Sequence, residues 1–219
     1  MNSPLIQLLV LAGIAIFLII KLRSVLGTRE GFEKPPVRAD QAAVQKRADF
    51  EVIEGGPDRD IVDYVPESSP TAKALAEMKK QDPDFTVGDF IGGARGAYEM
   101  ILMAFEKGDI SDVRPFLSAD VDEALSSVIA ERNAQGLTID AEFLGVSEVA
   151  IQHAEYDPTT KEAEITMRMT GEFTYTVRNA EGEIVEGGDK TPKRQRDIWT
   201  FARRMTENDP NWTLVATDE

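Results

Sequence analysis

The sequence predicts an α+β fold, with helices early in the chain and a curved antiparallel sheet after them. Apolar residues recur at helical spacing between Thr71 and Asn133. Over Glu164–Arg178 apolar and polar residues instead alternate, which is the pattern of a half-buried strand. Because helices and strands are segregated along the chain, an α+β arrangement is favoured over a parallel α/β fold.

The helical half is expected to hold two short and two longer helices. The first, Thr71–Lys80, gathers small and aliphatic residues loosely on one side. The second stops at Gly108 and Asp109, and its apolar residues are Phe90, Ala94, Ala97, Tyr98, Ile101 and Phe105. A short helix is expected after Ile110, and a longer one over Ala119–Asn133.

The strand half has its clearest signal in one long strand. Its inward face is predicted to carry Ile165, Met167, Met169, Gly171, Phe173, Tyr175 and Val177. The flanking "YDPTTK" and "NAEGE" have turn chemistry and predict antiparallel hairpins. Further strands are expected in "FLGVSEVAIQHAEY", "RQRDIWTFARRM" and "WTLVAT".

A twisted sheet with helices across one face often leaves an apolar hollow. Trp199, Phe201 and Trp212 are candidates to line such a pocket because they are large and lie on or beside the last strands. The alternative is that all three belong to the ordinary core.

The first 29 residues are predicted to be a membrane anchor with a basic flank. Leu5–Ile20 is uncharged, and Gln7 is its only strongly polar side chain. A helix that runs from Asn2 to Ile20 would span about 28 Å, close to the thickness of a bilayer core. Bases follow the apolar run and none precedes it, which argues against a cleaved signal peptide and for a single pass with the C-terminal side in the cytoplasm.

Residues 30–70 are predicted to be a flexible polar linker, and residues 71–219 the folded domain. "EKPP" breaks a helix that leaves the membrane, and the following run mixes both charges with glycine and proline. Only "IVDYV", residues 61–65, is apolar. This short segment could dock a partner or contact the chain's own domain.

Charge and composition exclude several classes of function. The net charge is −15 and residues 1–29 carry three bases and no acid, so residues 30–219 carry −15 − 3 = −18. A part this acidic repels phosphates, and nucleic-acid binding is not expected. The chain has no cysteine, which excludes disulfides, thiolate metal sites and cysteine nucleophiles.

The remaining motifs favour structure over catalysis. "GDFIGGARG" lacks the lysine of a phosphate-binding loop, and its glycines at every fourth residue fit close packing of a helix against a neighbour. His153 is the only histidine and is read as structural, and no metal or other cofactor is expected. Asp197 and Arg203 share a strand face and are interpreted as an ordinary surface pair. No catalytic residue is assigned.

Several separate stretches resemble one known family. "DFIGGARGAYEMILMAFEKGD", "LSADVDEAL", "EGEIVEGGD", "RQRDIWTFARRM" and "DPNWTLVAT" are similar, in this order, to the Tim44-like domain family, named after a subunit of the mitochondrial inner-membrane protein translocase. "IFLIIKLRSVLGTREGFEKPP" further resembles the membrane-anchored alphaproteobacterial members.

The resemblance implies a cone-shaped α+β domain similar to the nuclear transport factor two-like fold, with a large apolar pocket. It also implies that the helix Thr71–Lys80 touches acidic lipid, with Lys73, Lys79 and Lys80 as the membrane-contact candidates. The mitochondrial relative tethers a chaperone to the import channel. Its chaperone-binding part lies largely ahead of this domain, where the present chain has its anchor and linker.

Two functions of different classes follow. The first is a non-enzymatic adaptor at a bacterial inner membrane, whose cytoplasmic domain binds a protein partner, lipid, or both, in connection with protein translocation or a chaperone. The second is a pocket enzyme of the isomerase or dehydratase type, which requires an ionisable pair inside the domain.

Overall fold

The computed structural model describes residues 57–206 and 209–218, which belong to one compact unit. The predicted anchor Leu5–Ile20 and the predicted linker up to residue 56 lie outside the described residues. In the part of the chain that is described, no helix combines the length and the apolar character needed to cross a bilayer.

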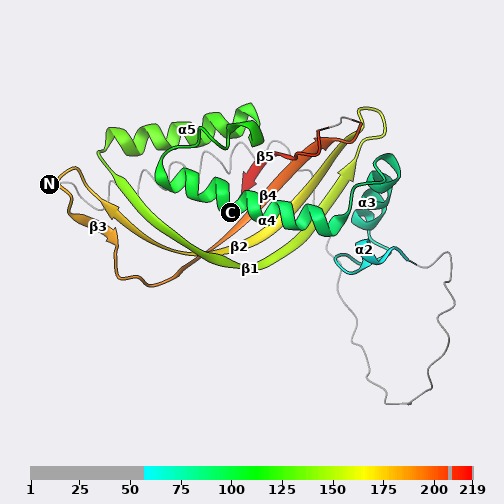
Figure 1. Ribbon diagram of the computed structural model, residues 1–219, viewed down its shortest axis with the longest axis horizontal. Helices are drawn as coiled ribbons and strands as arrows, with labels where there is room; N and C mark the ends of the chain where they lie inside the picture. The colour runs from blue at the N-terminus through cyan, green and yellow to red at the C-terminus, as the bar shows by residue number, and fades with distance from the viewer. Residues whose placement is uncertain (1–56, 207–208, 219) are drawn as a thin grey trace, which may run out of the picture. The chain divides into compact units, whose positions relative to one another are not determined.

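Helices precede strands, as the sequence predicts, and the α+β class is confirmed (Figure 1). The helical half contains α2 (Arg59–Val62), α3 (Pro70–Gln81), α4 (Val87–Lys107), the 3₁₀-helix η1 (Arg114–Phe116) and α5 (Ala119–Ala134). The sheet contains β1 (Thr138–Tyr156), β2 (Glu162–Arg178), β3 (Ile184–Gly187), β4 (Lys193–Arg204) and β5 (Thr213–Asp218).

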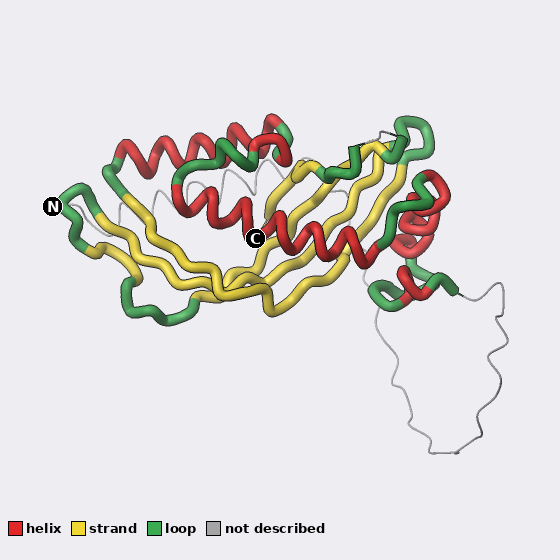
Figure 2. Tube along the Cα trace, in the orientation of Figure 1, coloured by secondary structure: helices red, strands yellow, loops and turns green. Residues whose placement is uncertain are grey.

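The strands form one antiparallel sheet in the order β1-β2-β4-β5, with β3 paired to the end of β2. Figure 2 shows that the long strands bend and that α4 crosses the hollow face of the sheet. Three register shifts interrupt the pairing of β1 with β2, one of them at Gly145. Bulges of this kind bend a strand and increase its twist, so they contribute to the curvature.

Local capping fixes where the helices begin and end. The side chains of Ser69, Thr86 and Ser118 accept hydrogen bonds from the first turns of α3, α4 and α5. Gly108 ends α4 in the left-handed conformation, with φ of 77°, as a helix-terminating glycine commonly does. The predicted stop at this residue is therefore confirmed.

The core lies between α4 and the inward face of β2 and β4. Ile165, Met167 and Met169 of β2 are fully buried, in agreement with the predicted alternation. Gly171 continues this row where Tyr98 of α4 packs on the sheet. A Cβ atom at Gly171 would lie 2.6 Å from the Tyr98 hydroxyl oxygen, so only glycine leaves room for this contact.

The predicted linker extends too far, because residues 57–70 are folded. α2 lies within this range, and Ile61 and Val65 of "IVDYV" are buried in the core. Asp60 accepts hydrogen bonds from the backbone N–H groups of Val87 (2.8 Å) and Gly88 (3.0 Å) at the start of α4. The contact of this segment with the chain's own domain, one of the two alternatives, is the one observed.

Candidate functional site

An aromatic pocket of about 320 Å³ lies between α4, β4 and the loops at residues 82–86 and 209–212. Trp212 lines it, and its ring centroid lies 4.7 Å from that of Phe90 and 5.8 Å from that of Phe85. Phe201 of β4 lies 6.0 Å from Phe90 in an edge-on arrangement. The pocket therefore has a wall of interlocked rings, the kind of surface that accepts an apolar group.

The rim of this aromatic pocket is polar and mostly acidic. Asp84, Asp89, Asn211 and Arg203 are among the lining residues. The guanidinium group of Arg203 is held by an ion pair with Asp82 (3.0 Å) and donates to the carbonyl oxygen of Asp209 (2.9 Å). Because the Arg203 charge is neutralised by Asp82, the rim presents mainly negative charge to the solvent.

The three predicted pocket residues separate into two groups. Phe201 and Trp212 line the aromatic pocket. Trp199 instead packs in the core against Tyr98, with ring centroids 4.9 Å apart, and it is not among the lining residues. Three further rings line the pocket without having been predicted to do so: Phe85, Phe116 and Phe90, the last of which was expected only on the apolar side of a helix. Phe85 precedes α4 and Phe116 follows it, so neither belongs to the helical pattern of α4. No sequence signal therefore predicts that these two residues line the pocket.

The interpretation that the glycines of α4 allow close packing holds at Gly88, where a Cβ atom would lie 3.5 Å from the Tyr64 hydroxyl and 3.6 Å from an Asp60 oxygen, but it is wrong for the other three. A Cβ atom at Gly92, Gly93 or Gly96 would meet nothing within 4 Å in the described chain. Gly93 lines the aromatic pocket. The missing side chain at this position therefore contributes open space to the pocket instead of a contact with a neighbouring element.

Asp197 and Arg203 are not a surface pair, contrary to the interpretation from the sequence. Asp197 is buried and accepts a hydrogen bond from the Tyr98 hydroxyl (2.5 Å) and one from the Gln195 amide (2.9 Å). Arg203 pairs with Asp82 instead. A strand pattern shows which face a residue occupies but not what packs on it, and here Tyr98 covers the carboxylate.

Burial shifts the pKa values of both members of this polar pair. Removal from water raises the pKa of Asp197 above its ordinary value, and the hydrogen bonds from Tyr98 and Gln195 oppose that rise only in part. Burial also raises the pKa of Tyr98, and its hydrogen bond to the carboxylate adds to this effect. Neither residue is among those that line the aromatic pocket.

The three predicted membrane-contact lysines differ in availability. Lys79 points toward α2, where its ammonium group lies 2.7 Å from an oxygen of Asp58 and 2.9 Å from an oxygen of Asp60. Lys80 pairs with Glu77 (2.6 Å) on the exposed side of α3. Lys73 is exposed. Of these three lysines, Lys73 and Lys80 are therefore the exposed ones, and Lys80 is paired with the exposed Glu77.

His153 lies on β1, as predicted, and its Nε2 atom is 2.8 Å from a carboxylate oxygen of Glu155. Both side chains are exposed. Within residues 57–206 and 209–218, no three histidine, aspartate or glutamate side chains gather in a group that could hold a metal ion.

These features define a class of domain: one bent antiparallel sheet, a long helix across its hollow face, and an aromatic pocket between the two. The sequence profile of the Tim44-like domain matches residues 71–219, and the chain belongs to this family.

The mitochondrial import inner membrane translocase subunit TIM44-1 of Arabidopsis thaliana is 24% identical over 136 residues, which is 62% of this chain and 28% of that protein. The chain thus spans less than a third of the relative's length. The crystal structure of the intermembrane space region of the chloroplast protein ARC6 superposes with a TM-score of 0.36 and 11% identity, covering 57% of this chain and 92% of that one.

Proposed function

We propose that this chain is a non-enzymatic adaptor associated with protein translocation, which holds a partner beside a membrane through its Tim44-like domain. The observation that carries the proposal is the aromatic pocket, whose rings are packed but leave about 320 Å³ open. The similarity to a translocase subunit supports the link to translocation.

The occupant of the pocket is an apolar group carried by a protein segment or by a lipid. The volume lies at the lower end of the range for ligand pockets, which begins at about 300 Å³. It therefore suits one or two side chains or part of an acyl chain. The acidic rim at Asp84 and Asp89 favours an apolar group with a positive charge next to it.

Membrane attachment is part of the same proposal. The apolar run Leu5–Ile20 is proposed to anchor the chain in a bacterial inner membrane with the domain in the cytoplasm. Anchoring raises the effective concentration of the domain at the membrane, so a low affinity of the pocket for its ligand would suffice. Extraction of membranes with alkaline carbonate should leave the full chain in the pellet and release a variant that lacks residues 1–29. Release of both would contradict the anchor.

The decisive experiment fills the pocket from α4. Gly93→Leu adds a side chain at a residue that lines the pocket, and Gly96→Leu makes the same change at a residue that does not; a Cβ atom at either position meets nothing within 4 Å in the described chain. A photo-crosslinking amino acid replaces Met100, which lines the pocket and is 43% exposed. The full chain in its native membrane should form a defined adduct, identified by mass as protein or lipid.

Gly93→Leu should abolish that adduct and Gly96→Leu should preserve it. As a second control, the same crosslinker at Leu144 of β1, which is 49% exposed and not among the lining residues, should not give the same adduct. The adaptor proposal fails if no adduct forms at residue 100, or if both leucine variants leave it unchanged.

One observation bears on the alternative, a pocket enzyme of the isomerase or dehydratase type. Tyr98 and Asp197 form the ionisable pair that such an enzyme requires inside the domain. The adaptor is preferred because both side chains are satisfied within the core and neither lines the pocket. If Asp197→Asn impairs cellular function while folding and the Met100 adduct are unaffected, the enzyme becomes the better proposal.

A further inference from the structure

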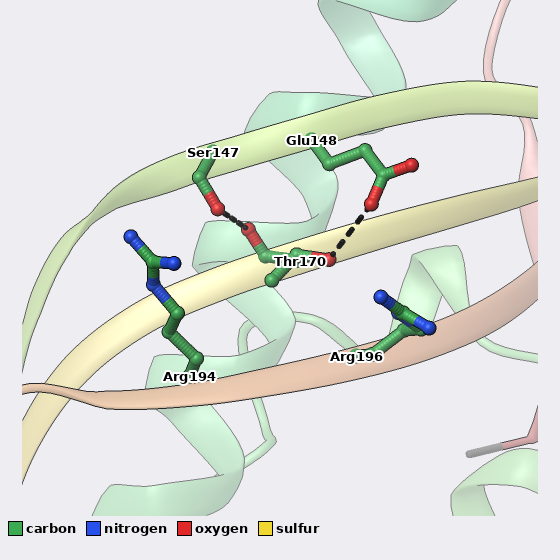
Figure 3. Close-up of a pocket in the computed structure, with 5 residues that line it drawn as sticks. All are labelled: Ser147, Glu148, Thr170, Arg194 and Arg196. Atoms are coloured by element: carbon green, nitrogen blue, oxygen red, sulfur yellow. Dashed lines mark hydrogen bonds between the residues drawn. The ribbon is translucent and has the colours of Figure 1, made fainter.

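The outward face of the sheet carries a second, chemically different feature. Because Gly171 and Met169 of β2 face α4, the alternate residues Thr170 and Glu172 face away from it. Register places Glu148 and Arg196 on either side of Thr170, and Arg194 opposite Glu172. An open groove of about 610 Å³ lies on this face, and Figure 3 shows the residues that line it: Ser147, Glu148, Thr170, Arg194 and Arg196.

The groove has more positive than negative charge, although the chain as a whole carries −15. Arg168 takes up the charge of Glu148 through Nε (3.1 Å) and Nη2 (2.7 Å). Glu172 approaches the guanidinium group of Arg194 at its Nε atom, at 2.8 Å. Three arginines against two glutamates leave a net charge of +1.

Arg196 supplies the excess charge. It lines the groove and forms no hydrogen bond or ion pair with any residue that the structure describes. Figure 3 shows Arg194 and Arg196 rising from β4 on either side of Thr170. Two residues apart on one strand face, they start about 7 Å from each other. Free N–H groups of both guanidinium groups are therefore available to one small anion between them.

We propose that this groove is a binding site for a phosphate group, held between the guanidinium groups of Arg194 and Arg196. A carboxylate has two oxygens and is saturated by one arginine in a bidentate pair. A phosphate offers three or more oxygens and can engage both arginines at once. The open form of the groove admits a phosphate on a larger molecule, so a phospholipid headgroup and a soluble phosphate share the required chemistry.

Ser147 and Thr170 shape the groove but are already engaged. The Ser147 hydroxyl donates to the Thr170 carbonyl oxygen (3.3 Å), and the Thr170 hydroxyl donates to Glu148 (3.4 Å). Arg168 binds Oε1 of Glu148 and the Thr170 hydroxyl binds Oε2, so both oxygens of this carboxylate have partners beside the groove. The two arginines therefore carry the recognition.

The test is a titration of the full chain, ¹⁵N-labelled and held in phosphatidylcholine nanodiscs, with inorganic phosphate at constant ionic strength. Amide signals of Thr170 and of residues 194–196 should shift and saturate. Arg196→Gln should weaken phosphate binding at least about tenfold, since one charge-assisted pair is lost. Arg95→Gln, which removes an exposed arginine from α4, should leave the affinity unchanged.

A second variant, expected to gain affinity, distinguishes loss of the site from misfolding, because a misfolded protein would not bind phosphate more tightly. Glu172→Gln frees the Nε atom of Arg194 and should strengthen phosphate binding several-fold. Shifts that do not saturate, or that are equal in the Arg196, Glu172 and Arg95 variants, would overturn the proposal. This result would leave the aromatic pocket untouched, because that pocket opens on the other face of the sheet.

A second experiment distinguishes a phospholipid headgroup from a soluble phosphate as the ligand. Nanodiscs that contain phosphatidic acid are compared with phosphatidylcholine alone, without added phosphate. The same amide shifts, absent in Arg196→Gln, identify a headgroup as the source. Shifts with inorganic phosphate alone identify a soluble phosphate. Each result supports the site and assigns its ligand.

Discussion

The hydroxyl of Tyr98 on α4 donates a 2.5 Å hydrogen bond to the carboxylate of Asp197 on β4, which lies 99 positions later in the chain. Both side chains are buried, and Gln195 donates a second hydrogen bond to the same carboxylate. The pair joins the long helix to the sheet at the position where Gly171 allows the ring to approach. It makes the stability of the domain depend on pH in a defined direction.

Asp197→Asn should change the pH dependence of stability. Because the pKa of Asp197 is raised in the fold, its protonated form is favoured there. Its contribution is therefore greatest below its ordinary pKa of 3.8 and is lost as the pH rises through the folded value. The variant lacks this pH-dependent contribution to stability. Its asparagine can keep both hydrogen bonds if the Gln195 amide turns over.

Urea unfolding of both proteins over a pH series measures the effect. The unfolding free energy of the wild type, minus that of the variant, should fall as the pH rises. The variant should be at least as stable as the wild type at neutral pH. A difference that is constant with pH would show that the carboxylate titrates normally.

Gly171→Ala should destabilise the domain by about 1–3 kcal/mol, because a new Cβ atom would force the tightly packed Tyr98 ring to move. That atom would lie 2.6 Å from the hydroxyl oxygen and 2.8 Å from Cε1 of the ring. Urea unfolding followed by tryptophan fluorescence reports the change, since Trp199 packs on the same ring. A neutral result would mean that the helix can lift from the sheet without loss.

Gly96→Ala on α4 should have the opposite sign. The Cβ atom meets nothing within 4 Å, and alanine is favoured over glycine in a helix by about 0.5–1 kcal/mol. The same urea measurement should show a corresponding stabilisation. If the variant is instead destabilised, α4 is packed against something at Gly96 that the described chain does not contain.

Asp60→Asn should release α2 from the start of α4. Burial acts to raise the pKa of Asp60, but its hydrogen bonds with Lys79, Val87 and Gly88 outweigh this and lower it. The stabilisation is therefore present above the ordinary pKa of 3.8 and is lost as the pH falls through the lower folded value. At neutral pH the substitution should cost about 1–2 kcal/mol.

Hydrogen exchange at the amides of Val87 and Gly88 measures this release locally. Exchange should accelerate in Asp60→Asn and in wild type at acidic pH. Asp63→Asn, a change at the exposed end of α2, should leave it unaffected. Equal protection in both variants would show that the segment 57–70 docks through the buried Ile61 and Val65 alone.

The periodic parts of the fold could be predicted from the sequence. Alternation identified the buried face of β2, and helical spacing located α4 and α5, with Gly108 marking the end of α4. The prediction stopped short on β1, which begins at Thr138, five positions before the predicted start at Phe143. The first part of β1 is an exposed end of the sheet, where little burial marks the strand.

Contacts between distant side chains could not be predicted. Nothing in "RQRDIWTFARRM" distinguishes a buried Asp197 from a surface one, because the partner Tyr98 lies on another element. Asp60 was missed for the same reason, and with it the folding of residues 57–70. Phe201 and Trp212 were found because large aromatic residues near a concave sheet tend to line its pocket, whereas Trp199 is equally large but lies under Tyr98.

The attachment of Asp60 also gives the domain a mechanical property. A pull on the chain ahead of residue 57 would first load Asp58 and Asp60, both held by Lys79, and the amides at the start of α4. These few contacts can yield without breaking a strand pair. We therefore expect α2, with the buried Ile61 and Val65, to detach under tension before any strand pair of the sheet separates.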